Sequence, residues 1–83
     1  MKAKEQFKEL GYKFSYNQNK TVMQYEKKER QWREEGQINI NFDLEERTIE
    51  TIFRGEISNN LPPILISEEI EAMNNQCREL DWL

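Results

Sequence analysis

Hydrophobic and polar residues alternate in the middle of the chain. Between residues 38 and 42, isoleucine or phenylalanine stands at every second position and asparagine at the positions between. Because successive side chains of a strand point to opposite faces, this pattern predicts a strand with one buried face. Residues 48–54 repeat the pattern with isoleucine, threonine and phenylalanine, so the polar link 43–47 is expected to turn an antiparallel hairpin.

Two shorter segments earlier in the chain are also expected to be strands. Tyr12, Phe14 and Tyr16 share one side of residues 12–16, which predicts a half-buried strand. A polar turn over residues 17–20 then leads into a further predicted strand, residues 21–27.

Residues 27–35 are the most ambiguous segment. They are rich in good helix formers, but Lys28 and Glu29 occupy positions where the hydrophobic stripe of a helix would need apolar side chains. We therefore predict a long, charged hairpin connection, with a strand extension or a helix as the alternatives. Gly36 ends the segment in each case.

Helical spacing marks both ends of the chain. Ala3, Phe7 and Leu10 share one face of a short helix predicted over residues 3–10, and Gly11 supplies the left-handed residue that ends it. A helix this short is stable only when it docks on the rest of the fold.

A longer helix is predicted over residues 68–81. Ser67 is a suitable N-cap, and acidic residues follow it at the positive end of the helix dipole. The preceding run at residues 64–66 is expected to return the chain to the core. The hydrophobic stripe of the predicted helix consists of Ile70, Met73, Cys77 and Leu80.

These elements together predict an α+β fold in one domain spanning residues 1–83. The expected architecture is an antiparallel β-meander of three to five strands, with a short N-terminal helix and a longer C-terminal helix packed on one face. Charged residues make up 34% of the chain. The nine aromatic residues nevertheless argue for a folded domain, because disordered segments are poor in aromatic residues.

Side chains that support catalysis are scarce. The absence of histidine removes the commonest general base and metal ligand, and Cys77 is interpreted as a small buried residue of the last helix. Carboxylates gather at Asp43, Glu45, Glu46 and Glu50, but no glycine stands where a calcium-binding loop needs one. We interpret them as a solvated turn and predict no catalytic residue, no metal site and no cofactor.

Charge is divided unevenly along the chain. Residues 1–33 carry a net charge of +5 and residues 34–83 a net charge of −9, which gives −4 overall. Such asymmetry points to a charged partner. The most basic segment surrounds a tryptophan, a combination that meets phosphates and stacks a base in single-stranded nucleic-acid binders. The candidate nucleic-acid surface is therefore Lys27, Lys28, Arg30, Trp32 and Arg33.

The acidic half offers a second surface, on the outer face of the predicted C-terminal helix. It would attract a basic partner protein, and we name Glu68, Glu69 and Glu71 as the candidate protein-binding surface. If the two charged halves stay apart in space, self-association becomes a third possibility, including a homodimer. Trp82 and Leu83 are expected to fold back on the sheet or the first helix, with a dimer contact as the alternative.

Three stretches of the chain form a recognisable set. They are FKELGY at residues 7–12, INFDLE at residues 40–45, and ISEEIEAMNNQ with ELDW at residues 66–76 and 79–82. Together they resemble small phage and prophage proteins of Gram-positive bacteria. In that family the last motif more often ends Glu-Leu-Gly-Trp, so Asp81 takes the place of a glycine. The resemblance implies a bacterial, phage-linked, cytoplasmic setting, and it assigns no activity and no functional residue.

The sequence therefore predicts a small accessory protein, without enzymatic activity, that binds a host or phage protein. Single-stranded nucleic-acid binding is the alternative, and a self-assembling structural subunit is the second alternative. No apolar stretch follows the start of the chain, so we expect no signal peptide, no membrane partner and a cytoplasmic location.

Overall fold

A computed structural model describes all residues from 1 to 83. The chain forms an α+β fold in which one helix precedes four strands and a second helix follows them. In chain order the elements are α1 (Ala3–Glu9), β1 (Lys13–Tyr16), β2 (Val22–Lys28), β3 (Gly36–Asp43), β4 (Thr48–Gly55) and α2 (Ser67–Glu79). The predicted fold class is therefore confirmed, and each predicted strand lies within two residues of its observed bounds.

The four strands form one antiparallel sheet in the order β1-β2-β3-β4. The register places Tyr25 beside Phe14 on one neighbouring strand and beside Ile40 on the other. Phe42 of β3 lies opposite Ile49 of β4. Because aromatic and β-branched residues pair across all three ladders, one face of the sheet is apolar along most of its length.

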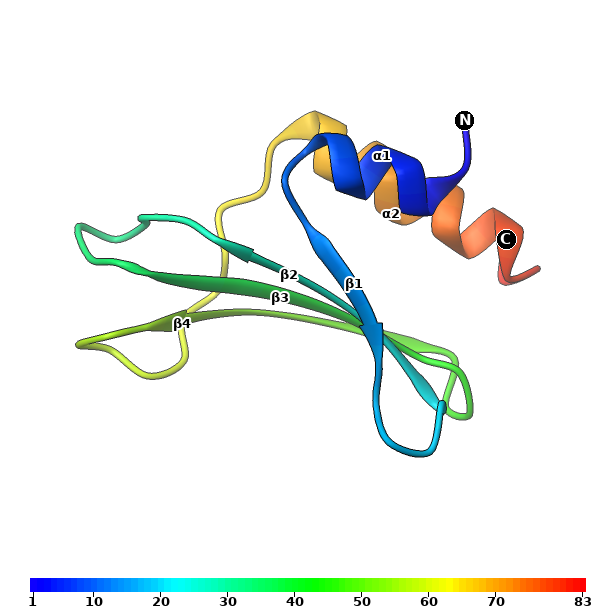
Figure 1. The fold of residues 1–83 in the computed structure, drawn as a ribbon, viewed down its shortest axis with the longest axis horizontal. Coiled ribbons are helices and arrows are strands. Elements are labelled where there is room, and N and C mark those ends of the chain that lie inside the picture. Colours follow the sequence, from blue (N-terminus) through cyan, green and yellow to red (C-terminus); the bar gives the residue numbers. More distant parts are fainter.

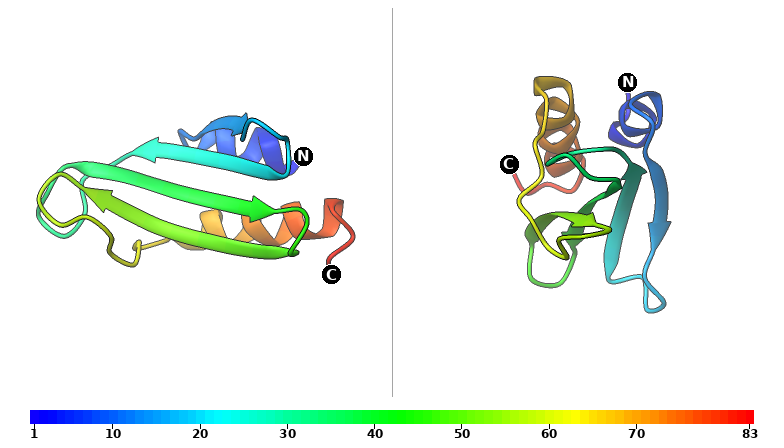
Figure 2. Two further views of the ribbon diagram at one scale, coloured as in Figure 1. Left: turned by 90° about the horizontal axis from the view of Figure 1, so that it is seen from below. Right: turned by 90° about the vertical axis from the view of Figure 1, so that its left-hand side faces the viewer.

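Both helices pack on that apolar face (Figures 1 and 2). The end-on view in Figure 2 places α1 over the β1–β2 side of the sheet and α2 over the β3–β4 side. The sheet extends past the helices, and the connection 56–66 runs from the end of β4 back to α2 (Figure 1). Neither helix combines the length and the apolar character that crossing a membrane requires.

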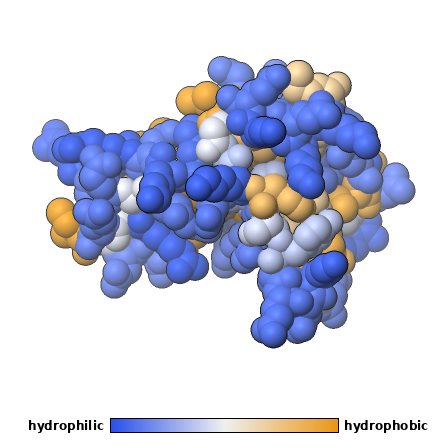
Figure 3. Space-filling model, viewed as in Figure 1, coloured by the Kyte–Doolittle hydropathy of each residue, from blue (hydrophilic) through white to orange (hydrophobic).

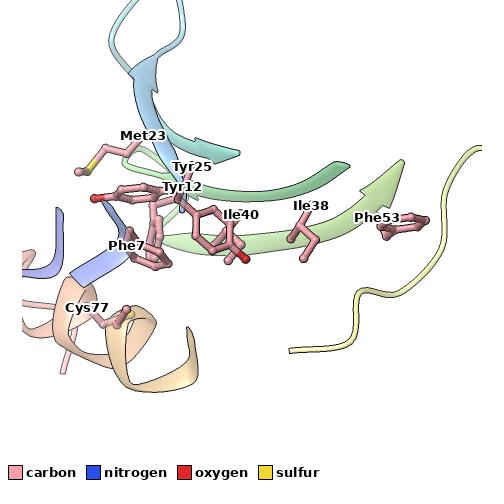
Figure 4. Packing of buried hydrophobic residues seen from close by; sticks show 10 residues of the cluster. Phe7, Tyr12, Met23, Tyr25, Ile38, Ile40, Phe53 and Cys77 are labelled. Atoms are coloured by element: carbon pink, nitrogen blue, oxygen red, sulfur yellow. The ribbon is translucent and has the colours of Figure 1, made fainter. Parts of the chain in front are cut away.

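The core is built on stacked aromatic rings (Figure 4). The ring of Phe7 in α1 stacks on that of Tyr25 in β2, with their centres 4.0 Å apart. Figure 4 shows the cluster continuing along the sheet to Phe53, beside the connection 56–66. Cys77 is buried in this core, which raises the pKa of its thiol, so its interpretation as a small buried residue is confirmed.

Both helices end in the same hydrogen-bonded motif. At α1, the Tyr12 N–H donates to the Phe7 carbonyl and Gly11 adopts a φ of 96°. At α2, the Trp82 N–H donates to the Cys77 carbonyl and Asp81 adopts a φ of 60°. This is the Schellman cap, whose left-handed residue is usually glycine.

The last two residues of the chain behave differently from one another. The Trp82 ring lies 6.2 Å from that of Phe42, so its predicted packing on the sheet is confirmed. Leu83 is exposed, so the expectation that it also folds back is wrong. The last hydrogen bond of the Schellman cap is made by the Trp82 N–H, so the cap fixes Trp82 against Phe42 but does not fix Leu83.

The face that α2 buries includes Met73, Cys77 and Leu80 of the predicted stripe but not Ile70. Ile70 is exposed, whereas Glu69, Ala72 and Gln76 are buried with Cys77. The cause lies in the core tyrosines, whose buried hydroxyl groups need acceptors. The Tyr12 hydroxyl donates to the Glu69 carboxylate. The hydroxyl of Tyr25 in β2 donates to Gln76 Oε1 at 2.6 Å. Two polar side chains therefore take inward positions and turn Ile70 outward.

The start of α2 also differs from the prediction. Ile66 is the N-cap and Ser67 is the first helical residue. The Ile66 N–H donates to Glu69 Oε1 at 2.8 Å, which is the half of a capping box that needs no hydroxyl at the cap. The prediction of Ser67 as the cap is therefore wrong by one residue.

The ambiguous segment is a tight hairpin. β2 extends to Lys28, and a bridge between Gln31 and Glu34 encloses a two-residue turn. Trp32 and Arg33 form this turn with φ angles of 54° and 61°, as a type I′ turn requires. The prediction of a hairpin is confirmed, whereas its description as a long connection and the helical alternative are wrong, because the ladder continues almost to the turn.

Candidate functional site

The tip of the β2–β3 hairpin holds the connection 56–66 in place. The Gln31 side-chain amide forms two hydrogen bonds of 2.8 Å with the backbone of Ile64, one as donor and one as acceptor. The Trp32 indole N–H donates to the Pro62 carbonyl at 2.9 Å. These contacts join residues about thirty positions apart, so the hairpin and the connection form one surface.

A buried carboxylate fixes the other part of this connection. Glu34 Oε1 accepts hydrogen bonds from the backbone N–H groups of Ile57 at 3.0 Å and Ser58 at 2.9 Å. These bonds favour the charged form and hold the pKa of Glu34 below its ordinary value. Gly55 is needed beside it, because a Cβ at that position would overlap the Glu34 carboxylate.

The predicted nucleic-acid surface is divided by the structure. Lys27 and Lys28 are successive residues of a strand, so their side chains lie on opposite faces of the sheet. Lys27 Nζ lies 3.0 Å from a carboxylate oxygen of Glu29, and Arg30 Nη1 lies 3.5 Å from a carboxylate oxygen of Glu35. Two of the four cations are therefore paired with carboxylates.

Glu29 sits at the centre of the polar contacts on this hairpin. Burial raises the pKa of Glu29, but hydrogen bonds from Gln31 and Lys27 outweigh burial and hold it below its ordinary value. Trp32 is 48% exposed, and Arg33 beside it is exposed without a carboxylate partner. The exposed tip therefore presents one indole and one guanidinium group without a carboxylate partner, rather than a continuous basic run.

A group of lysines that was not predicted from the sequence surrounds the junction of α1 and β1. Lys4, Lys8 and Lys13 line a hollow of about 410 Å³ together with Tyr12 and Phe14. Lys4 Nζ lies 4.2 Å from the centre of the Phe14 ring, within the range of a cation–π contact. Figure 3 shows hydrophobic residues at the surface in this region. The lysines come from two elements, so no run of sequence marks them.

The predicted acidic surface is only partly exposed. Glu68 and Glu71 lie on the outer side of α2, and the Ser67 hydroxyl donates to Glu68 Oε1 at 2.6 Å, which lowers the pKa of that carboxyl. Glu69 is 2% exposed and faces the core, so its place in a protein-binding surface is wrong. Its carboxylate is occupied by Tyr12 and the backbone of Ile66.

Three isoleucines form an exposed line that we call the isoleucine ridge: Ile64, Ile66 and Ile70. They are 54%, 49% and 48% exposed, respectively. Ile64 and Ile66 are two positions apart in an extended segment, so their side chains lie on the same side. Ile70 is four positions after the N-cap Ile66, so its side chain lies next to that of Ile66 along the helix. Trp32 and Pro62 continue the ridge toward the hairpin tip.

The hydrophobic pattern of the sequence predicts all three ridge residues in the core. In the structure only Leu65 of the run 64–66 packs against the core, and its neighbours point away from it. The alternation of an extended segment was the signal available in the sequence. Figure 3 shows hydrophobic residues at the surface where the connection reaches α2.

The carboxylates between β3 and β4 belong to a turn. Asp43 Oδ1 accepts hydrogen bonds from the backbone N–H groups of Glu45 at 3.0 Å and Glu46 at 2.9 Å, the pattern of an Asx turn. No group of three carboxylate or thiol side chains in the structure is arranged to hold a metal ion.

Comparison with known proteins finds no matching family model, no matching curated protein and no matching solved structure.

Proposed function

We propose that this chain is a non-catalytic protein-binding module that contacts its partner through the isoleucine ridge. The observation that supports this proposal is the exposure of three large aliphatic side chains in one line, each about half accessible to solvent. Contiguous exposed apolar residues mark interaction sites more often than scattered ones do.

The ridge has the composition of an interface centre. Burying the remaining surface of each isoleucine would contribute about 1 kcal/mol, half of the value for a fully buried side chain. Trp32 stands at one end of the ridge, and tryptophan and arginine are enriched among residues that dominate binding free energy. Glu68 and Glu71 line a hollow with Gln6, Glu9 and Leu10 on the α1 side of α2, so they lie apart from the ridge, and the partner surface that fits the ridge is apolar.

The two alternatives have less support. Single-stranded nucleic-acid binding through Lys27–Arg33 would need the cations on one face, and Lys27 and Lys28 face opposite sides of the sheet. Self-assembly would need a surface on one copy of this chain that is complementary to a surface on a second copy. The resemblance to phage and prophage proteins suggests a bacterial cytoplasmic setting, in which the partner is a host or phage protein.

A capture experiment with matched variants tests this proposal. The tagged protein is exposed to lysate of a Gram-positive bacterium with and without nuclease, and bound proteins are identified by mass spectrometry. We expect a stoichiometric, nuclease-resistant partner that Ile66→Ser and Ile70→Ser lose. Ile57→Ser is the control, because Ile57 is 82% exposed but lies outside the ridge.

Three results would contradict the proposal. Equal capture by ridge and control variants would remove the ridge from the interface. Recovery of nuclease-sensitive material alone would favour the nucleic-acid alternative. A concentration-dependent mass of the purified protein, abolished by Ile66→Ser, would make a second copy the partner of the ridge.

A further inference from the structure

The outer edge of β4 carries backbone groups without partners. The Phe53 N–H and carbonyl point outward and bond Leu61 at 2.8 and 2.9 Å. Because hydrogen-bonding directions alternate along an antiparallel strand, the backbone groups of Ile49 and Thr51 point to the same outer edge. No other part of the chain bonds these four groups.

The chain itself stops the edge from being covered. Continuing the antiparallel pairing of Phe53 with Leu61 would place Pro63 opposite Thr51. Pro63 has no N–H to donate, so the ladder ends there. The next residue, Ile64, bonds the Gln31 side chain over the apolar face instead.

The two edges of the sheet differ in their protection. The β1 edge has only four residues and carries Lys13, and short strands with lysine are common means of blocking edge pairing. The stretch Thr48–Ile52 of β4 is rich in β-branched residues and contains neither lysine nor proline. Such an edge is a template for another strand.

A second copy of the chain is a poor occupant of this edge. Antiparallel pairing that bonds both Ile49 and Thr51 to their symmetry mates places Glu50 directly opposite Glu50 of that copy, and like charges at that position are destabilising. If the pairing is shifted toward Phe53, the second copy needs backbone groups of Phe53 that already bond Leu61. If the pairing is shifted the other way, it needs Arg47, a turn residue whose φ of 58° is not that of a strand.

We infer that β4 accepts an extended segment of a partner protein with an apolar–basic–apolar sequence, paired antiparallel to Ile49–Thr51. The two apolar residues exchange backbone hydrogen bonds with Ile49 and Thr51. The basic residue lies opposite Glu50, on the solvent face of the sheet. This inference rests on the proposed function and names the form of the partner segment.

The position of the edge agrees with the isoleucine ridge. The end-on view in Figure 2 shows β4, the connection and α2 on the same side of the molecule. Ile49 points to the face that bears the helices and is 36% exposed. A strand added to β4 therefore lies on the side from which the ridge is reached.

A peptide titration tests the inference. The probes are acetyl-Thr-Val-Lys-Val-Thr-amide and the same peptide with glutamate in place of lysine, added to nitrogen-15-labelled protein and followed by amide chemical shifts. We expect saturable shifts centred on Ile49 and Thr51, with the lysine peptide binding about fivefold more tightly, as cross-strand charge pairs imply. Glu50→Lys reverses that preference.

Edge variants provide the second readout. Thr51→Pro removes an N–H that the sheet does not use and is expected to abolish binding, whereas Thr51→Val keeps the N–H and is expected to bind. Circular dichroism checks that each variant is folded, and if Thr51→Pro does not fold, the Glu50→Lys reversal remains decisive. Absence of saturable shifts at millimolar peptide, or equal affinity for both peptides, overturns the inference.

The failure of this inference can be told apart from failure of the proposed function. If Thr51→Pro still captures the partner that Ile66→Ser loses, the protein-binding function stands and strand addition is overturned. If wild-type protein dimerises and Thr51→Pro does not, a second copy occupies the edge and the inference is overturned. Loss of the same captured partner in both variants supports both proposals.

Discussion

The Tyr12 hydroxyl donates a hydrogen bond to the buried carboxylate of Glu69. This contact joins the segment after α1 to the first turn of α2, fifty-seven residues away. The second carboxylate oxygen of Glu69 accepts the Ile66 N–H, so one side chain caps α2 and fixes it to the core. Burial, and then the hydrogen bond and charge of Glu69, raise the pKa of Tyr12, so the hydroxyl keeps its proton and remains a donor.

Tyr12→Phe is expected to destabilise the protein by about 1–3 kcal/mol, because it leaves one oxygen of a buried carboxylate without a partner. The free energy of unfolding, measured by urea titration, checks this prediction. Tyr16→Phe is the matched control, since Tyr16 is exposed and is expected to change stability by less than about 0.5 kcal/mol. Equal effects of the two substitutions would show that the Tyr12 hydroxyl contributes nothing specific.

The sequence pattern was sufficient for the sheet but not for every residue on the buried face of α2. Strand alternation depends only on neighbouring residues, and it placed all four strands correctly. The orientation of α2 depends on hydroxyl groups of Tyr12 and Tyr25, which lie more than fifty residues away and require acceptors. A hydrophobic stripe therefore predicted Ile70 inside, where the structure has Glu69.

The candidate surfaces were harder to predict for the same reason. The isoleucine ridge exists because Gln31 and Trp32 hold the connection 56–66 beside the hairpin tip. The open edge of β4 exists because Pro63 ends the pairing that Leu61 begins. Neither contact can be predicted from the local spacing of hydrophobic residues, because each joins segments that come together only when the whole sheet has formed.

Asp81→Gly is expected to stabilise the protein by about 1 kcal/mol. Asp81 holds a left-handed conformation, which is unfavourable for a residue with a Cβ and free of that penalty for glycine. Gly11 already serves the equivalent position at the end of α1. Thermal unfolding measures the gain, and Asp81→Ala is the control, because it removes the carboxylate but keeps the Cβ. A gain of equal size with alanine would assign the effect to charge rather than to backbone conformation.

Arg33→Gly is expected to raise stability by about 1 kcal/mol and to weaken partner binding. The second residue of a type I′ turn favours glycine, and Arg33 has a φ of 61° with its side chain exposed. Arginine at a strained, exposed position beside Trp32 is consistent with a role in recognition. Urea titration and partner capture are measured on the same variant. Unchanged capture would remove Arg33 from the interface but leave the stability prediction intact.

Glu34→Gln tests the anchoring of the connection 56–66 through pH. Hydrogen bonds to the backbone hold the pKa of Glu34 below 4.5 in the folded state, so its charged form stabilises the fold fully above that pH. This stabilisation is lost as the pH falls through the lowered folded-state pKa. Glutamine keeps an acceptor oxygen but not the charge, so the wild-type protein should be more stable by a constant amount at neutral pH. The difference in the free energy of unfolding should shrink below pH 4.5.

Other carboxyl groups titrate in both proteins, so the difference between the two proteins isolates Glu34. A difference that is independent of pH down to acid unfolding would contradict this account.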